Sequence, residues 1–174
     1  MPLFRKKVAP AEKVREEERV ELKKGYSYLV KESEPVKSYE LFKNELLKNS
    51  KGLCFSRNHP EKIKQRYGLE NVELYWLSHA HEDKGQIDPT NLVRIMIILR
   101  EFLKGIGDKV VLIDGIEYLI FRNGFTALLR FIQSLNEHIV LSDSILIVPI
   151  NPRTLNGKEL ALLGLEMEIV EAVY

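Results

Sequence analysis

The chain has 174 residues, of which 45% are hydrophobic and 29% charged, and this composition is typical of one soluble globular domain. A net charge of +1 excludes a protein that coats nucleic acid over its whole surface, and no feature signals specific DNA binding. The single cysteine, Cys54, excludes an internal disulfide framework, and no apolar window reaches the roughly 18 residues of a membrane span, so we expect a cytoplasmic protein without membrane contact.

Residues 1–24 form a charged segment with few apolar positions, and we predict an N-terminal arm ahead of a single domain at 25–174. The arm is either a solvated tail or a short helix that docks on a partner. Its basic residues outnumber its five glutamates, so an RNA or ribonucleoprotein partner such as the ribosome is one hypothesis. These basic residues are Arg5, Lys6, Lys7, Lys13, Arg15, Arg19, Lys23 and Lys24.

From Gly25 onward, short apolar runs alternate with helical patterns. The runs are rich in β-branched and aromatic residues and predict buried strands. We place these strands at 26–30, 52–56, 72–78, 109–114 and 144–150, with an edge strand within 167–173. The helical patterns lie at 38–48, 60–68, 88–104, 125–135 and 154–166. This alternation predicts an α/β fold of three layers, with helices on both faces of a mostly parallel sheet.

The predicted helix at 88–104 opens on Asp88 as a cap followed by Pro89, and it is apolar on nearly all sides. A helix that covers a sheet needs only one apolar face. We therefore predict a homodimer in which this helix packs against a second copy, with deep burial inside one protomer as the alternative. The candidate interface residues are Leu92, Ile95, Met96, Leu99 and Phe102.

The segment KESEPVKS, which follows the first predicted strand, has part of the pattern of a phosphate-binding loop, G-x-x-x-x-G-K-[ST]. Lys37 and Ser38 match the last two places, but Lys31 and Val36 stand where the glycines belong. A phosphate cradle turns backbone N–H groups inward through residues at positive φ, which a β-branched valine resists, and Pro35 removes one donor. We therefore predict a degenerate P-loop that no longer binds nucleotide.

Asp114 ends the apolar run KVVLID, where P-loop enzymes carry the acid that helps to hold magnesium. It either completes a vestigial nucleotide site with Lys37 and Ser38 or caps the turn that follows it. Both interpretations stay open. The sequence shows no complete catalytic set, so we expect no enzymatic activity and no cofactor.

The segment LSHAHEDKG resembles the metal signature H-x-H-x-D-H of metallo-β-lactamase-type hydrolases, with His79, His81 and Asp83 in matching places. Lys84 stands where the last histidine belongs, and that family needs further ligands downstream. The alternation of strands and helices also differs from the two-sheet sandwich of that family. We therefore favour a polar loop on the ligand side of the sheet over a metal site.

Four segments together resemble the archaeal family catalogued as domain of unknown function 835. They are YWLSH at 75–79, VVLIDGIEYLIFRNGF at 110–125, IVPINPRTL at 147–155 and ELALLGLE at 159–166. The resemblance covers about 25–170 and implies an archaeal source and a layout similar to RecA-like P-loop proteins. It implies no activity and no catalytic residues.

These observations favour a non-catalytic interaction or regulatory protein, an adaptor, built as a homodimer on a degenerate P-loop scaffold. Its partner would be a protein or a ribonucleoprotein. Two alternatives come from other classes of function. One is an RNA- or ribosome-associated factor that docks through the basic arm, and the other is a residual nucleotide-binding sensor that uses Lys37, Ser38 and Asp114.

Overall fold

Seven parallel strands form the central sheet of the computed structural model, which describes residues 19–80 and 84–172. The order of the strands across the sheet is β4-β3-β2-β5-β6-β1-β7, and every pair is parallel. The strands are β1 (Ser27–Lys31), β2 (Lys51–Ser56), β3 (Val72–Leu77), β4 (Gln86–Ile87), β5 (Lys109–Asp114), β6 (Ile145–Ile150) and β7 (Glu168–Glu171). The predicted edge strand near the C-terminus is therefore confirmed as β7.

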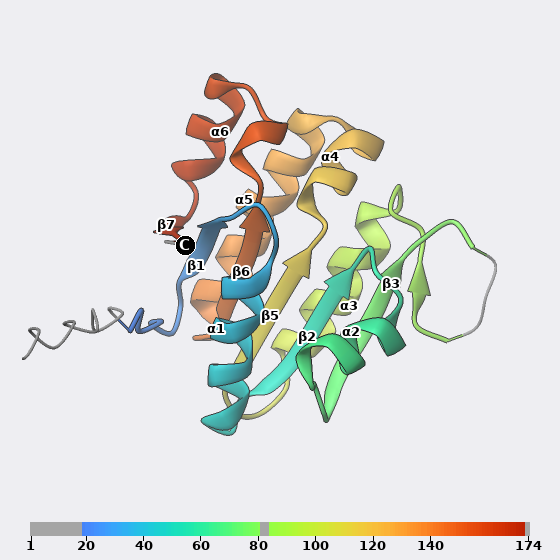
Figure 1. The fold of residues 1–174 in the computed structure, drawn as a ribbon, viewed down its shortest axis with the longest axis vertical. Coiled ribbons are helices and arrows are strands. Elements are labelled where there is room, and N and C mark those ends of the chain that lie inside the picture. Colours follow the sequence, from blue (N-terminus) through green and yellow to red (C-terminus); the bar gives the residue numbers. More distant parts are fainter. Residues whose placement is uncertain (1–18, 81–83, 173–174) are drawn as a thin grey trace, which may run out of the picture.

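Helices cover both faces of the sheet, as Figure 1 shows. One face carries α1 (Val36–Leu47) and α2 (Pro60–Tyr67), and the other carries α3 (Leu92–Leu103) and α5 (Phe125–Leu141). The short helices α4 (Ile116–Asn123) and α6 (Gly157–Gly164) lie toward the end where the strands finish, and a 3-10 turn, Pro152–Thr154, follows β6. The predicted three-layer α/β class is confirmed.

The two faces of the sheet build two separate apolar cores, because side chains alternate along each strand. In β5, Val110 and Leu112 pack with α1 and α2, whereas Val111 and Ile113 pack with α3 and α5. All four side chains are fully buried. A strand buried on both faces must be apolar at every position, which is why the central strands appear in the sequence as unbroken apolar runs.

The third predicted helix begins four residues later than expected. Asp88 does not cap it, because its carboxylate accepts hydrogen bonds from the N–H and hydroxyl of Thr90 at 2.8 and 2.7 Å. Asn91 is the cap instead, accepting from the N–H of Arg94 at 3.0 Å, and the helix starts at Leu92. The two-residue strand β4, which the sequence prediction missed, lies just before this turn.

The described part of the N-terminal segment, residues 19–24, contacts the domain. Leu22 is buried in the core on the α1 side, and the N–H of Lys23 donates to the hydroxyl of Tyr28 at 2.7 Å. Lys24 forms an ion pair with Asp108 at 2.8 Å. The other predicted arm cations, except Arg19, lie outside the described residues. Within the described part of the chain, no helix is long and apolar enough to cross a membrane.

Candidate functional site

The carboxyl ends of the parallel strands meet at one edge of the sheet, where α/β proteins bind their ligands. The register of β2 and β5 pairs Ser56 with Asp114, and that of β1 and β6 pairs Lys31 with Ile150. The chain leaves β1 at Glu32 and enters α1 at Val36, so this edge lies beside the first turn of a helix. The residues predicted to contact nucleotide therefore lie at the correct edge.

The first turn of α1 is already occupied by a carboxylate of the protein itself. Glu32 accepts hydrogen bonds from the backbone N–H of Lys37 at 2.8 Å and of Ser38 at 3.0 Å, and also from the hydroxyl of Ser38. Glu32 is only 5% exposed. Because the first N–H groups of a helix are its natural anion-binding donors, the side chain of Glu32 takes the place that a phosphate group would need.

The backbone of this loop also differs from that of a phosphate cradle. Positive φ is confined to other parts of the described chain, so the segment 31–38 forms no nest of inward N–H groups. The N–H of Val36 donates to the carbonyl of Glu34 at 2.7 Å, and Pro35 has none to offer. The ammonium of Lys37 lies 3.3 Å from Glu40 on the same helix.

Asp114 belongs to a buried polar network rather than to a helix cap. Its carboxylate accepts from the hydroxyl of Tyr39 at 2.7 Å and from the hydroxyl of Ser56 at 3.1 Å. Gly115 is the residue that precedes α4, with φ 138°, and α4 has no side-chain cap. The interpretation of Asp114 as a cap is therefore wrong, and the carboxylate instead ties α1 to β2 and β5.

The ionisation of this network follows from its burial. Burial raises the pKa of Asp114 above its ordinary value, and the hydrogen bonds from Tyr39 and Ser56 oppose the shift. Burial also raises the pKa of Tyr39 and of Cys54, so the phenol and the thiol stay protonated. Cys54 is fully buried in β2, as expected for the predicted buried strand at 52–56, and its burial leaves it unsuited to nucleophilic chemistry.

Aromatic side chains near this edge are packed against neighbours, and sequence reasoning did not single them out. The rings of Tyr39 and Tyr67 stack with centroids 3.7 Å apart. The guanidinium of Arg57 lies 4.1 Å from the ring centre of Tyr118, and Trp76 donates to the carbonyl of Arg57 at 3.0 Å. These residues lie on different helices, strands and loops and share no local sequence pattern that would predict their contacts.

The predicted metal residues fall mainly outside the described chain, because His81 and Asp83 belong to the gap at 81–83. His79 is described, and its Nδ1 lies 3.4 Å from the carboxylate of Asp88. Among the described residues, no group of three or more histidine, cysteine, aspartate or glutamate side chains is arranged to hold a metal ion.

The predicted dimer residues of α3 separate into two classes. Ile95 and Leu99 are 1% and 0% exposed and pack in the core of the protomer, so they are not available to a second copy. This corrects their predicted place at an interface. Leu92, Met96 and Phe102 are half-buried against the same core. The outward face of α3 carries Val93 and Ile97 instead, 71% and 45% exposed.

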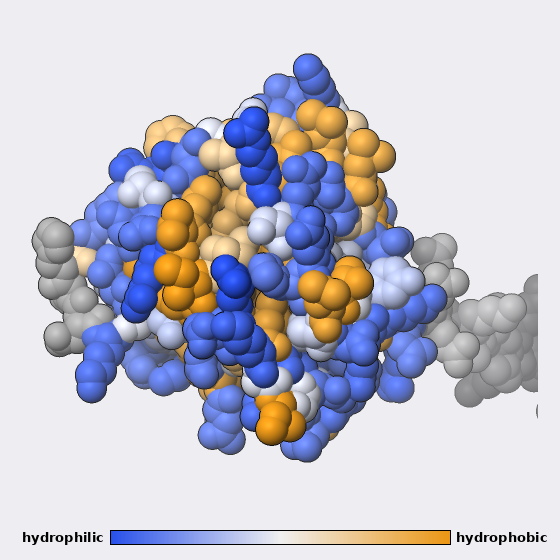
Figure 2. All heavy atoms as spheres, turned by 180° about the vertical axis from the view of Figure 1, so that it is seen from behind, coloured by the Kyte–Doolittle hydropathy of each residue, from blue (hydrophilic) through white to orange (hydrophobic). Residues whose placement is uncertain are grey.

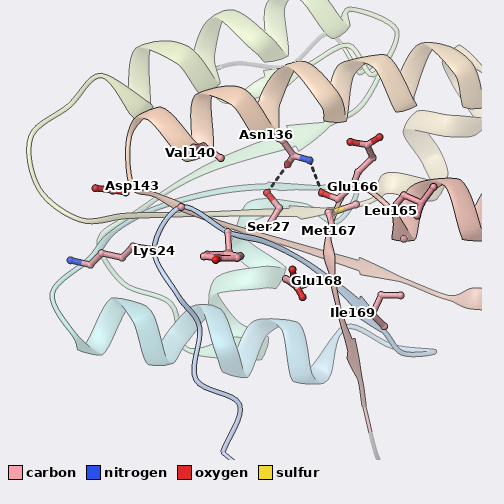
Figure 3. Close-up of a pocket in the computed structure, with 13 residues that line it drawn as sticks. Lys24, Ser27, Asn136, Val140, Asp143, Leu165, Glu166, Met167, Glu168 and Ile169 are labelled. Atoms are coloured by element: carbon pink, nitrogen blue, oxygen red, sulfur yellow. Dashed lines mark hydrogen bonds between the residues drawn. The ribbon is translucent and has the colours of Figure 1, made fainter.

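A groove of about 940 Å³ lies at the opposite end of the sheet, between the start of β1, the end of α5 and the link from α6 to β7. Figure 3 shows Ser27 and Asn136 inside it, joined by a hydrogen bond of 2.6 Å. Asn136 also donates to the carbonyl of Glu166 at 2.8 Å. Val140 and Leu165 line the groove and are 61% and 82% exposed, so it offers apolar walls over a polar floor.

The solved structures that are similar to this chain include two archaeal proteins. One comes from a study titled "Structural study of Project ID PH0250 from Pyrococcus horikoshii OT3", with a TM-score of 0.64 and 15% identity over 87% of this chain and 84% of that chain. The other is the flagellar accessory protein FlaH from Methanocaldococcus jannaschii, with a TM-score of 0.61 and 18% identity over 86% of this chain and 72% of that chain. Both similarities show the fold of this chain, which is a three-layer α/β architecture of the RecA-like kind.

No curated protein matches the chain. A family model described as "Protein of unknown function (DUF835)" matches residues 31–167. This range includes the last residue of β1, α1 to α6 and the carboxyl edge of the sheet as the structure describes them. The chain therefore belongs to the DUF835 family.

Proposed function

We propose that this protein is a non-catalytic, homodimeric adaptor or regulatory protein on a RecA-like scaffold whose P-loop has degenerated. The observation that carries the proposal is the position of Glu32. Its carboxylate holds the two N–H groups at the start of α1, and the hydroxyl of Ser38 points to the same carboxylate. A triphosphate would have to displace a buried anion of its own sign before it could use these donors.

The other residues of the predicted nucleotide site also interact with neighbours in the domain. Lys37 pairs with Glu40, and Asp114 accepts from Tyr39 and Ser56. Both of these hydrogen bonds go to Oδ2 of Asp114, and they hold the carboxylate against α1 and β2. Lys37, Ser38 and Asp114 therefore all interact with neighbouring groups of the domain.

Exposed apolar side chains supply the surfaces that an adaptor needs. They occur on α3, at the end of α5, and at the turn between α6 and β7, where they border the groove. The structural neighbour FlaH is described as a flagellar accessory protein, and an accessory role would fit the adaptor proposed here. The sources of both relatives support the further proposal that this chain is archaeal.

Isothermal titration calorimetry with Mg-ATP tests the loss of nucleotide binding. We expect no saturable binding up to about 1 mM ATP for the wild-type chain, which corresponds to less than about 4 kcal/mol of binding free energy. Micromolar binding that disappears in Lys37→Ala would overturn the proposal in favour of a nucleotide sensor. Affinity capture from the native cell extract, with and without nuclease, then distinguishes a protein partner from a ribonucleoprotein.

A further inference from the structure

The groove at the start of β1 is walled by apolar side chains that remain exposed. They are those of Tyr26, Val140, Leu165 and Ile169, which are 45%, 61%, 82% and 47% exposed. Figure 2 shows the molecule from the side covered by α3 and α5, and apolar side chains gather there in separate patches among hydrophilic ones. Exposed apolar side chains around one groove form a surface that can bind the apolar side chains of another segment.

The charges of the groove are mostly negative. Its lining contains three carboxylates, called here the groove carboxylates, which Figure 3 labels: those of Asp143, Glu166 and Glu168. None of the ion pairs among the described residues includes them, although Glu166 accepts a hydrogen bond from Gln133 at 2.8 Å. Lys24 also lines the groove, but it pairs with Asp108 at 2.8 Å. The groove therefore favours a segment that is both apolar and positively charged.

The same surface of a second copy does not have this composition. Two identical surfaces that meet across a two-fold axis present the same residues to each other. The groove carboxylates of one copy would then approach those of the other, and like charges oppose such an interface. The occupant must therefore come from a segment of different composition.

The first ten residues of the chain, which lie outside the described residues, have the required composition. They contain Arg5, Lys6 and Lys7 and no acidic residue. Leu3 and Phe4 precede these cations, and a valine follows them. Residues 11–18 instead contain two basic and four acidic residues. Residues 3–8 thus combine three positive charges with apolar side chains, as the groove combines three carboxylates with apolar walls.

The chain is also long enough to bring residues 3–8 to the groove. Arg19 is the first described residue, and the lining of the groove begins five residues later, at Lys24. Five residues span at most about 18 Å, whereas the ten residues at 9–18 span up to about 33 Å. A tethered segment within reach meets its site at an effective concentration on the order of 1 mM, so even a weak contact forms.

We propose that residues 3–8 dock in the groove of the same protomer. Leu3 and Phe4 lie against the apolar walls, and the three cations that follow face the groove carboxylates. A partner that binds either the groove or the basic segment must first separate the two, so the arm regulates access to both. This inference requires neither the lost P-loop nor the homodimer.

Zero-length carbodiimide cross-linking of the full chain, followed by mass spectrometry, tests the contact. The reagent joins an amine to a carboxylate only where the two are in contact, so we expect Lys6 and Lys7 to be linked to the groove carboxylates. The ion pair of Lys24 with Asp108 provides an internal control. In a mixture of isotope-labelled and unlabelled chains, the expected links join residues of one isotopic form only.

Substitutions on both sides of the contact test its specificity. Leu165→Lys, at an 82% exposed position, removes an apolar wall and adds a positive charge, so the yield of links from Lys6 and Lys7 should fall about tenfold. Phe4→Ser removes the apolar anchor from the arm and leaves the groove unchanged, and it should lower the same yield. Leu47→Lys, at a 78% exposed position on α1, is the matched control and should not change it.

Three results would overturn the proposal. The first is that Lys6 and Lys7 form no links to the groove carboxylates while Lys24 is linked to Asp108. The second is an equal yield in the wild type, Leu165→Lys and Phe4→Ser, because the links would then depend on neither the groove wall nor the anchor. The third is that the links join labelled to unlabelled chains, which would assign the groove to the arm of another copy. The link between Lys24 and Asp108 should persist in every variant and shows that the fold is kept.

Discussion

Glu32→Ala is expected to lower the free energy of unfolding by about 3 kcal/mol, because hydrogen bonds to a buried charged group contribute about 1.5–3 kcal/mol each and water replaces only part of them. The variant removes the acceptor of two N–H groups at the start of α1 and of the Ser38 hydroxyl. It also removes an anion from the positive end of the helix dipole. Urea denaturation followed by circular dichroism measures the change as a lower midpoint with an unchanged slope.

Two further variants distinguish the loss of the Glu32 hydrogen bonds from a general loss of negative charge. Glu32→Gln keeps one carbonyl oxygen as an acceptor, so its cost should lie between those of wild type and Glu32→Ala. Glu40→Ala removes a 51% exposed carboxylate of the same helix, paired with Lys37, and should cost less than about 0.5 kcal/mol. Equal effects of Glu32→Ala and Glu40→Ala would show that the hydrogen bonds of Glu32 contribute nothing beyond its charge.

Local patterns predicted much of the fold. Each of the five predicted apolar runs corresponds to a strand of the sheet. The pattern is clearest in β6, which is buried at every position and has no polar residue. The outline of the P-loop was also visible, since Val36 and Pro35 constrain the backbone whatever the rest of the chain does. Glu32 could not be predicted as the replacement for phosphate, because it occupies a variable place of the motif and its partners depend on how the loop turns back.

Contacts between residues far apart in the sequence could not be predicted. Tyr39 and Asp114 are 75 residues apart, and only the packing of α1 on β5 brings them together. The face of α3 was uncertain for another reason. A helix that is apolar nearly all round has no polar side to orient it, so the buried Ile95 and Leu99 could not be distinguished from the exposed Val93 and Ile97. The structure shows which side of α3 faces the core, because Ile95 and Leu99 are buried whereas Val93 and Ile97 are exposed.

The second large effect is expected at Tyr39, which is 1% exposed and links α1 to the sheet. Tyr39→Ala should lower the free energy of unfolding by about 4 kcal/mol, since it opens a cavity, removes the stacking on Tyr67 and leaves Asp114 with Ser56 as its remaining hydroxyl donor. Tyr39→Phe keeps the ring and removes only the hydroxyl, so it should cost about 1–2 kcal/mol at neutral pH. Chemical denaturation measures both costs.

The hydroxyl of Tyr39 should also set the pH at which the domain loses stability through Asp114. Burial holds the pKa of Asp114 above 3.8 in the folded state, so this group contributes stability that is fully present below the unfolded pKa and lost as the pH rises through the folded one. The hydrogen bond from Tyr39 lowers that folded pKa. Tyr39→Phe should therefore raise it, and the loss of stability should extend to higher pH.

Asp114→Asn provides the control for this titration, because its side-chain amide keeps an oxygen for Tyr39 but carries no proton that dissociates. The Asp114 component is the difference between the denaturation midpoints of a protein and of its Asp114→Asn variant, measured from pH 3 to pH 8. It should fall with rising pH in the wild type and fall over a wider pH range in the Tyr39→Phe background. A pH dependence that is the same in all three proteins would show that Asp114 is not the group that titrates. Asp114 would then stabilise the domain only through its hydrogen bonds, and this contribution would not change with pH.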